Sequence, residues 1–191
     1  MIGLLAAIEA VATSNDSLRS AIGSAIAPPS ADDHVMPTYS QTDPAWANDP
    51  IGTTTIGRFG CLITCWAMIL SQVEGRDVPP NEVVSRLDKA GRLQSNGGVL
   101  YVDLPKITAV PLVTWERVGG DGAELFGRAD AVDCVASFGV VGVRIGEWPG
   151  THYVLTIGDG WIINPIGGRR ERFDDKYKSG GIFSAAVWSI V

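Results

Sequence analysis

The sequence has few positive charges and no basic tract. It carries 15 Lys and Arg residues against 21 Asp and Glu residues, which gives a net charge of −6. The densest basic stretch is only Arg169-Arg170-Glu171-Arg172. Affinity for nucleic acid comes mainly from cations that neutralise phosphates, so no nucleic-acid partner is expected.

Cysteine and histidine are also scarce, with three cysteines and two histidines in 191 residues. Cys61, Cys65 and Cys134 cannot all pair within one chain, which favours reduced thiols over a disulfide scaffold. His34 lies in a polar linker and is expected to be solvated and without a role. His152 is then the one histidine available for chemistry.

Long apolar runs are absent as well. The first eight residues are apolar, but they lack the positively charged start of a secretory signal, and Glu9 interrupts them. No stretch approaches the ~20 apolar residues that span a bilayer. We therefore expect a soluble protein without a standard signal peptide, cytoplasmic unless it is part of a larger assembly.

The patterns that are present predict an α+β domain. Helices are expected first and an antiparallel sheet afterwards, because the last third alternates short β-rich segments with turns. The predicted helices cover residues 1–26, 61–74, 81–91 and 123–137; residues 98–115 are expected as short extended segments broken by prolines; and the predicted strands are 140–145, 152–157, 161–164 and 183–191.

Two domains are expected along the chain. Residues 1–30 form a helical extension, which Pro28-Pro29-Ser30 ends, and residues 31–191 form the main domain. The apolar stripe of the first helix allows two interpretations. It either packs on the main domain or docks the protein onto a larger assembly.

The predicted hairpin of strands 152–157 and 161–164 brings two polar residues together. A three-residue turn centred on Asp159 makes positions at equal distance from Asp159 face one another. His152 and Asn164 then share a face as diagonal neighbours, roughly 7–8 Å apart at the backbone. Asn164 would accept the ring N–H of His152 and fix its tautomer. A turn of two or four residues would destroy this geometry.

Cys61 is the candidate nucleophile. It lies in the first turn of a predicted apolar helix, directly after Gly60, which would leave room in front of the sulfur. The helix dipole and an adjacent imidazolium would stabilise its thiolate. The alternative is a buried structural cysteine, and Cys65 and Cys134 are interpreted in that way.

The remaining candidates have alternatives too. Asn164 is equally suited to a turn before Pro165, and His152 to the interior or surface of a strand. Cys61, Cys65 and His152 could supply three zinc ligands, but the short two-cysteine loop and a fourth ligand are missing. Neither a metal nor another cofactor is therefore expected.

Several stretches carry a resemblance to a known family: residues 39–46, 54–57 and 60–68, followed by His152-Tyr153-Val154-Leu155, Ile163-Asn164-Pro165, Gly167-Gly168 and Tyr177. Their order and combination resemble the C39-like cysteine peptidases, which have a papain-like fold and occur in phage and bacterial cell-wall proteins. The resemblance covers about residues 37–178. It implies a papain-like α+β domain, with N-terminal helices packed on an antiparallel sheet.

The resemblance also assigns roles. It implies Cys61 as nucleophile, His152 as base, Asn164 as the residue that orients the base, and Gln41 as oxyanion-hole donor. Gln41 is otherwise a solvated loop residue. The chain departs from the family in two places: the family commonly has Asp near the late proline, and it often has Gly-Pro-Thr where this chain has residues 62–64.

The function implied by the resemblance is a cysteine endopeptidase that hydrolyses peptide bonds, most plausibly in peptidoglycan. A docking helix at residues 1–30 would suit a lysin of a phage tail or virion, bound to virion or tail proteins. The two departures motivate an alternative, a catalytically silent papain-like module of a larger assembly. A third interpretation is the same thiol chemistry with an amine acceptor, as in transpeptidases or transglutaminases.

Overall fold

The chain divides into two units, Met1–His34 and Val35–Val191. A computed structural model of the protein describes residues 36–118, 122–132, 137–145, 150–177 and 181–190, all in the second unit. The predicted helix over residues 1–26, the docking segment 1–30, His34 and Cys134 lie outside the described residues.

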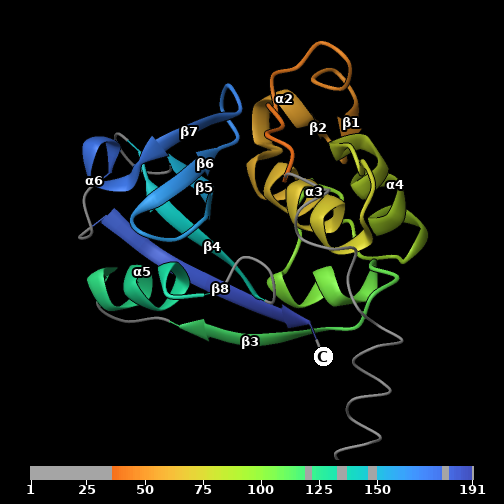
Figure 1. The fold of residues 1–191 in the computed structure, drawn as a ribbon. Coiled ribbons are helices and arrows are strands. Elements are labelled where there is room, and N and C mark those ends of the chain that lie inside the picture. The colour runs from red at the N-terminus through yellow and green to blue at the C-terminus, as the bar shows by residue number, and fades with distance from the viewer. Residues whose placement is uncertain (1–35, 119–121, 133–136, 146–149, 178–180, 191) are drawn as a thin grey trace, which may run out of the picture. The chain divides into compact units, whose positions relative to one another are not determined.

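Six strands form one sheet in the part of the chain that the structure describes (Figure 1). Every paired strand in it is antiparallel to its neighbour. The order across the sheet is β3 (Leu112–Val118), β8 (Ile182–Ile190), β4 (Ser137–Arg144), β5 (Thr151–Thr156), β6 (Trp161–Asn164) and β7 (Arg169–Arg172). Two short strands, β1 (Pro50–Ile51) and β2 (Thr54–Thr55), pair separately.

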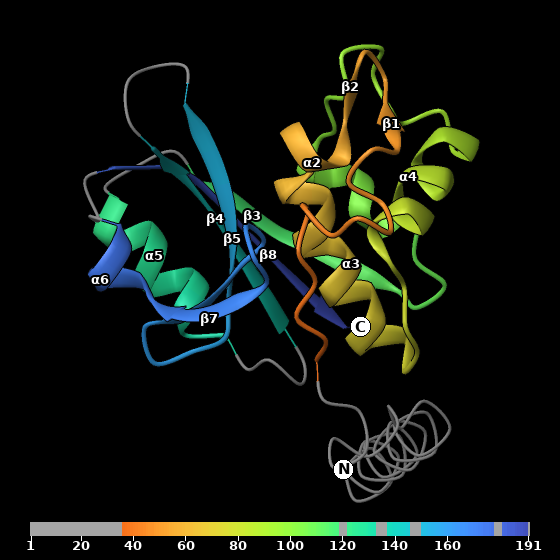
Figure 2. The ribbon, with the colours of Figure 1, turned by 90° about the horizontal axis from the view of Figure 1, so that it is seen from above.

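Helices cover both faces of the large sheet (Figure 1, Figure 2). The helical elements are α2 (Ile56–Phe59), α3 (Cys61–Glu74), α4 (Pro80–Lys89), the 3₁₀ helix η1 (Tyr101–Lys106), α5 (Gly122–Asp130) and α6 (Phe173–Lys176). Leu155 and Ile163 belong to the core that contains α3, whereas their neighbours Val154 and Ile162 belong to the core that contains α5. Alternate side chains of one strand thus point to opposite faces of the sheet and enter two different cores.

Helix α3 is the element that carries the candidate nucleophile. All of its residues except Gln72 and Glu74 are buried, as expected of a helix that is apolar on every side. It ends at Gly75, whose φ of 63° is left-handed and suits glycine. Trp66 packs edge-on against Trp188 of β8, at a ring-centroid distance of 6.3 Å. The sheet therefore holds α3, and Cys61 at its first position, in place.

The predicted α+β class is confirmed, but its simple order of helices before strands is wrong. Strand β3 and helix α5 precede β4. The predicted helix over residues 123–137 ends at Asp130, where the Asp130 carboxylate accepts the N–H of Gly160 at 2.8 Å. This hydrogen bond ties the end of the helix to the β5–β6 turn, and Ser137 already belongs to β4.

The prediction of extended segments over residues 98–115 is also wrong for the first half of that range. The Asp103 carboxylate accepts the N–H of Leu100 at 2.9 Å, which starts the 3₁₀ helix η1. Extended structure begins at Leu112. Strand β7 and helix α6, between residues 169 and 176, were not predicted.

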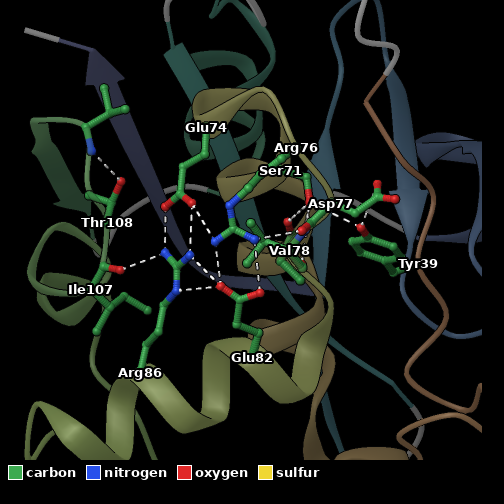
Figure 3. Close-up of polar contacts among 12 residues, drawn as sticks. Tyr39, Ser71, Glu74, Arg76, Asp77, Val78, Glu82, Arg86, Ile107 and Thr108 are labelled. Carbon is green, nitrogen blue, oxygen red and sulfur yellow. Dashed lines mark hydrogen bonds and ion pairs between the residues drawn. The ribbon is translucent and has the colours of Figure 1, made fainter.

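A charged network joins the end of α3 to α4 (Figure 3). The Arg86 guanidinium uses its five N–H donors on the carboxylates of Glu74 and Glu82 and on the carbonyl of Ile107, at 2.5–3.1 Å. The Glu74 side chain is only 6% exposed. Burial acts to raise the pKa of Glu74, but the hydrogen bonds and charge of Arg86 outweigh it and lower the pKa.

We predict that Arg86→Met lowers the free energy of unfolding by about 3 kcal/mol, because it leaves the buried Glu74 carboxylate without its main partner. The double variant Glu74→Met/Arg86→Met should recover most of this loss, since neither charge remains buried. Urea unfolding measures both. Arg128→Met, which breaks an exposed pair with Glu124, is the control and should cost less than about 0.5 kcal/mol. A double variant no more stable than Arg86→Met would contradict the prediction.

Candidate functional site

Cys61 lies at the first position of α3, directly after Gly60, and is 9% exposed. Gly60 was expected to leave room in front of the sulfur. The structure gives a different reason for the glycine: a Cβ there would lie 2.5 Å from the carbonyl oxygen of Ile56. Gly60 therefore allows the short helix α2 to pack closely against the start of α3.

The start of α3 lies against strand β5 at Tyr153, whereas the side chains of His152 and Asn164 lie near Tyr177, which belongs to the core that contains α5. The Cys65 thiol lies 3.7 Å from the carbonyl oxygen of Tyr153, and the backbone N–H of Tyr153 interacts with the Cys61 thiol. Strands β5 and β6 pair at Leu155 and Thr156, so Tyr153 lies outside that pairing. The structure thus places Cys61 against the residue that follows His152.

His152 and Asn164 meet as the hairpin register predicts. Leu155 faces Ile163, and Thr156 faces Ile162, so the turn is centred on Asp159. His152 Nε2 and Asn164 Oδ1 are 2.9 Å apart, and the two residues are 2% and 1% exposed. The predicted three-residue turn and the predicted contact across it are both confirmed.

The hydrogen bonds around Asn164 fix the orientation of its amide. Its Oδ1 also accepts the backbone N–H of Ile166 at 2.9 Å. Its Nδ2 donates to Glu171 Oε2 at 3.0 Å and to the Tyr177 hydroxyl at 3.2 Å. Reversing the amide would place two N–H groups against each other at Ile166. Because Oδ1 can only accept, His152 Nε2 carries the proton, and Nδ1 is left as the basic nitrogen.

The electrostatics of the site differ from the expectation for Cys61. Burial raises the pKa of its thiol, although the backbone N–H groups of Tyr153, Leu62 and Cys61 itself favour the thiolate. Burial likewise lowers the pKa of His152, and the hydrogen bond to Asn164 opposes this only in part. Both shifts favour the neutral thiol and the neutral imidazole over the expected thiolate–imidazolium pair.

Gln41 is buried and forms hydrogen bonds to both sides of the site. The alternative interpretation, a solvated loop residue, is therefore wrong. Its backbone N–H donates to the carbonyl of Pro165 at 2.8 Å, next to Asn164. Its side-chain Nε2 donates to the carbonyl of Gly57 at 3.0 Å, in helix α2 ahead of Cys61. That bond uses one of two amide hydrogens, so a second donor remains. Gln41 is 5% exposed.

Glu171 is the site residue that sequence reasoning missed. It lies on β7, where Asn164 faces Arg169, so positions 164, 169 and 171 share a face by the strand period. The same parity argument that joined His152 to Asn164 would have found it, had β7 been predicted. Tyr177, by contrast, was among the residues of the family resemblance. Burial and the charge of Glu171 raise the pKa of Tyr177 to about 12, so its hydroxyl stays protonated.

A cavity of about 440 Å³ opens beside His152. Its wall includes Arg144 from the end of β4, Lys176 from α6, and Ile145 and Ile166 from the loops that follow β4 and β6. The two isoleucines are 39% and 47% exposed. The base thus lies at the border of a space large enough for a peptide side chain.

Other kinds of site find little support in the described residues. There, no group of three or more His, Cys, Asp and Glu side chains is arranged to hold a metal ion. Within the same ranges, no helix has the length and apolar character to cross a membrane. No protein-family model matches the chain, and the comparison with curated proteins also gives no match.

We predict that the pKa of His152 responds in opposite directions to its two charged neighbours. Glu171→Gln should lower it, because the carboxylate charge raises the pKa, and Lys176→Gln should raise it, because the ammonium charge lowers it. Imidazole NMR titration measures this, and only two histidine signals need assignment. Glu124→Gln on α5 is the control and should leave the pKa unchanged. Equal shifts in the same direction for both variants would contradict the geometry.

Proposed function

We propose that this protein is a cysteine endopeptidase with a papain-like fold, related to the C39-like peptidases that its sequence resembles. The single observation that carries the proposal is the 2.9 Å hydrogen bond from His152 Nε2 to Asn164 Oδ1, on a strand whose next residue, Tyr153, lies against the Cys61 thiol at the N-terminus of α3. This bond presents the imidazole as a base with a defined free nitrogen. Nucleophile, base and orienting residue are the three parts that thiol hydrolases need.

The proposed reaction begins with two neutral groups. His152 Nδ1 takes the proton of the Cys61 thiol as the sulfur attacks the carbonyl carbon of the substrate, which forms a C–S bond and an oxyanion. The backbone N–H of Cys61 and the second N–H of Gln41 Nε2 would stabilise that oxyanion. The imidazolium then gives its proton to the leaving amine as the C–N bond breaks.

The second half of the reaction releases the acyl group. His152 takes a proton from a water molecule, the hydroxide oxygen attacks the thioester carbon, and the C–S bond breaks. The proton returns to the sulfur, and the carboxylic acid product leaves. Because the resting pair is neutral, proton transfer from Cys61 accompanies attack, and the orientation of His152 by Asn164 matters in both halves.

The substrate we propose is a peptide, the cross-bridge or stem peptide of peptidoglycan. A protein of this kind would serve as a lysin of a phage tail or virion that opens the wall during infection, with residues 1–30 as the docking segment. Mass spectrometry of purified particles tests the placement, and absence of the chain from them would contradict it.

One observation favours the second candidate, a papain-like module without turnover. Cys61 is only 9% exposed, and burial raises the pKa of its thiol, as expected of a structural cysteine. The two candidates differ in what they require of Cys61. An enzyme needs the sulfur for bond cleavage, whereas a silent module needs only its volume.

We predict that the protein releases new amine and carboxyl ends from at least one of a panel of purified cell walls, and that Cys61→Ala abolishes this release. Muropeptide analysis and loss of turbidity measure the effect. The matched control is Cys65→Ala, which removes a buried thiol one turn later on the same helix and should retain release. Release without added amine also separates hydrolysis from transpeptidation.

No release from any wall, together with Cys61 alkylation by iodoacetamide that is no faster than that of a free thiol, would favour the silent module. Release that persists in Cys61→Ala would exclude Cys61 as the nucleophile.

We predict that Gln41→Ala lowers kcat by about 10²-fold to 10³-fold, the usual loss when one oxyanion donor is removed. KM should change much less, because the oxyanion forms only after binding. Unfolding measurements separate this effect from the loss of the bond to Gly57. Gln94→Ala, at an exposed position, should leave both constants unchanged. A rise in KM at constant kcat would assign Gln41 to substrate binding instead.

A further inference from the structure

The hydrogen-bond ladder between β5 and β6 ends before it reaches Tyr153. The N–H of Ile157 donates to the carbonyl of Trp161, and the bonded pairs of an antiparallel ladder recur at every second residue. The next bonded pair contains Leu155, and the one after it would join Tyr153 to Pro165. Proline has no N–H to donate, so this last pair cannot form in the usual way.

The carbonyl of Pro165 is also used elsewhere. It accepts the backbone N–H of Gln41 at 2.8 Å. Of the two groups through which position 165 would bond to Tyr153, one is therefore missing and the other already has a donor. This explains in physical terms why the register of β5 with β6 stops where it does.

The peptide groups of Tyr153 are not bonded to β4 either. The N–H of Ile145 donates to the carbonyl of Gly150, so the bonded pairs of the β4–β5 ladder fall on the even-numbered residues of β5. Tyr153 faces Gly142 in a pair without hydrogen bonds. Its N–H and its carbonyl therefore both point away from β4, toward the side on which β6 has ended.

Two thiols of α3 take the place of the missing strand partner. Cys65 Sγ donates to the carbonyl of Tyr153 at 3.7 Å, and the N–H of Tyr153 donates to the Cys61 thiol. The spacing of four residues puts both sulfurs on one face of the helix, one turn apart. Cys65 thus supplies the donor that Pro165 lacks, and Cys61 receives the N–H that the ladder leaves over.

The side chain of Tyr153 is held as closely as its peptide. Its ring makes edge contacts with the rings of Tyr101 and Phe183, at centroid distances of 5.9 Å and 5.8 Å. At Gly142 on β4, a Cβ would lie 3.0 Å from Tyr153 Cε1, so the glycine lets this ring pack closely on the sheet. The N–H that meets Cys61 therefore belongs to a residue fixed from several sides.

We propose that Pro165 is a positioning residue for Cys61, because it ends the β5–β6 ladder and so leaves the N–H of Tyr153 to hold the sulfur at the N-terminus of α3. The role rests on the proposed function, since only that function makes Cys61 a nucleophile. The hydrogen bond itself does not depend on it, and its effect on the thiol is measurable without a substrate.

Two changes to the full-length protein test this role. Pro165→Ala restores an N–H that can bond to the Tyr153 carbonyl and extend the ladder, which draws the Tyr153 peptide away from the thiols. Replacing the amide of Tyr153 by an ester, with the α-hydroxy acid analogue of tyrosine at this position, removes the donor itself and leaves Pro165 unchanged. Because that N–H belongs to neither ladder, the sheet keeps its hydrogen bonds.

The measurement is the rate of Cys61 alkylation by iodoacetamide as a function of pH, with the modified peptide identified by mass spectrometry. We expect the midpoint of the profile to rise by about one pH unit in both variants, because the lost donor favours the thiolate. The titratable side chains that sense the charge of Cys61 are Cys65 and Tyr177, and neither variant alters them.

Pro111→Ala is the matched control. Pro111 is an exposed proline directly before β3, at the opposite edge of the sheet, and its replacement should leave the midpoint unchanged. Loss of the fold cannot imitate the expected result. Burial holds the pKa of Cys61 above its ordinary value, so an unfolded variant would shift the midpoint down, toward that of a free thiol.

A midpoint that is unchanged or lower in either variant overturns the proposal, and so does an equal rise in Pro111→Ala. The proposed function is scored separately, by Cys61-dependent release from cell walls. Release with unchanged midpoints keeps the peptidase and removes the role of Pro165. Raised midpoints in a protein that releases nothing keep the hydrogen bond to the thiol and remove the peptidase.

Discussion

The turn between β5 and β6 sets the geometry on which the candidate site depends. Its three residues, Gly158, Asp159 and Gly160, all have positive φ values, of 86°, 55° and 72°. Two glycines adopt this conformation without steric cost, and aspartate tolerates it better than most residues. One residue more or fewer would move His152 and Asn164 to opposite faces of the sheet. A loop of three residues therefore decides whether the imidazole has a partner.

Burial is the second constraint, and it opposes ionisation of both Cys61 and His152. The helix N-terminus and the neighbouring N–H groups favour a thiolate at Cys61, but the loss of water outweighs them. The same loss keeps His152 neutral and basic. In the reaction we propose, charge would thus appear only as the bonds change, in a site where preorganised donors interact more strongly than they would in water. The orientation of the imidazole then matters more than its charge at rest.

Local patterns were enough to predict the parts of the site that lie in regular structure. The apolar run beginning at Cys61 predicted α3, and strand parity predicted the contact of His152 with Asn164. Sequence could not predict Glu171, because Arg169–Arg172 is a charged stretch whose role as a strand depends on pairing with β6. Likewise, the 3₁₀ helix at Tyr101–Lys106 follows from one side-chain hydrogen bond at Asp103, which no periodicity records. The raised pKa of Cys61 comes from burial in the folded chain, which no local sequence pattern records.

The family that the sequence resembles commonly has an aspartate near the late proline, and this chain has Asn164 there. Asn164 lies between the imidazole of His152 and the carboxylate of Glu171. The negative charge therefore lies one side chain further out, and Lys176 partly neutralises it there. Lys176 also lines the cavity beside His152. A ligand that drew Lys176 away from Glu171 would remove a cation from the neighbourhood of the imidazole and strengthen the influence of the carboxylate. Ligand binding and the basicity of His152 would then be thermodynamically linked, so that a ligand bound in the cavity would increase the proton affinity of the imidazole.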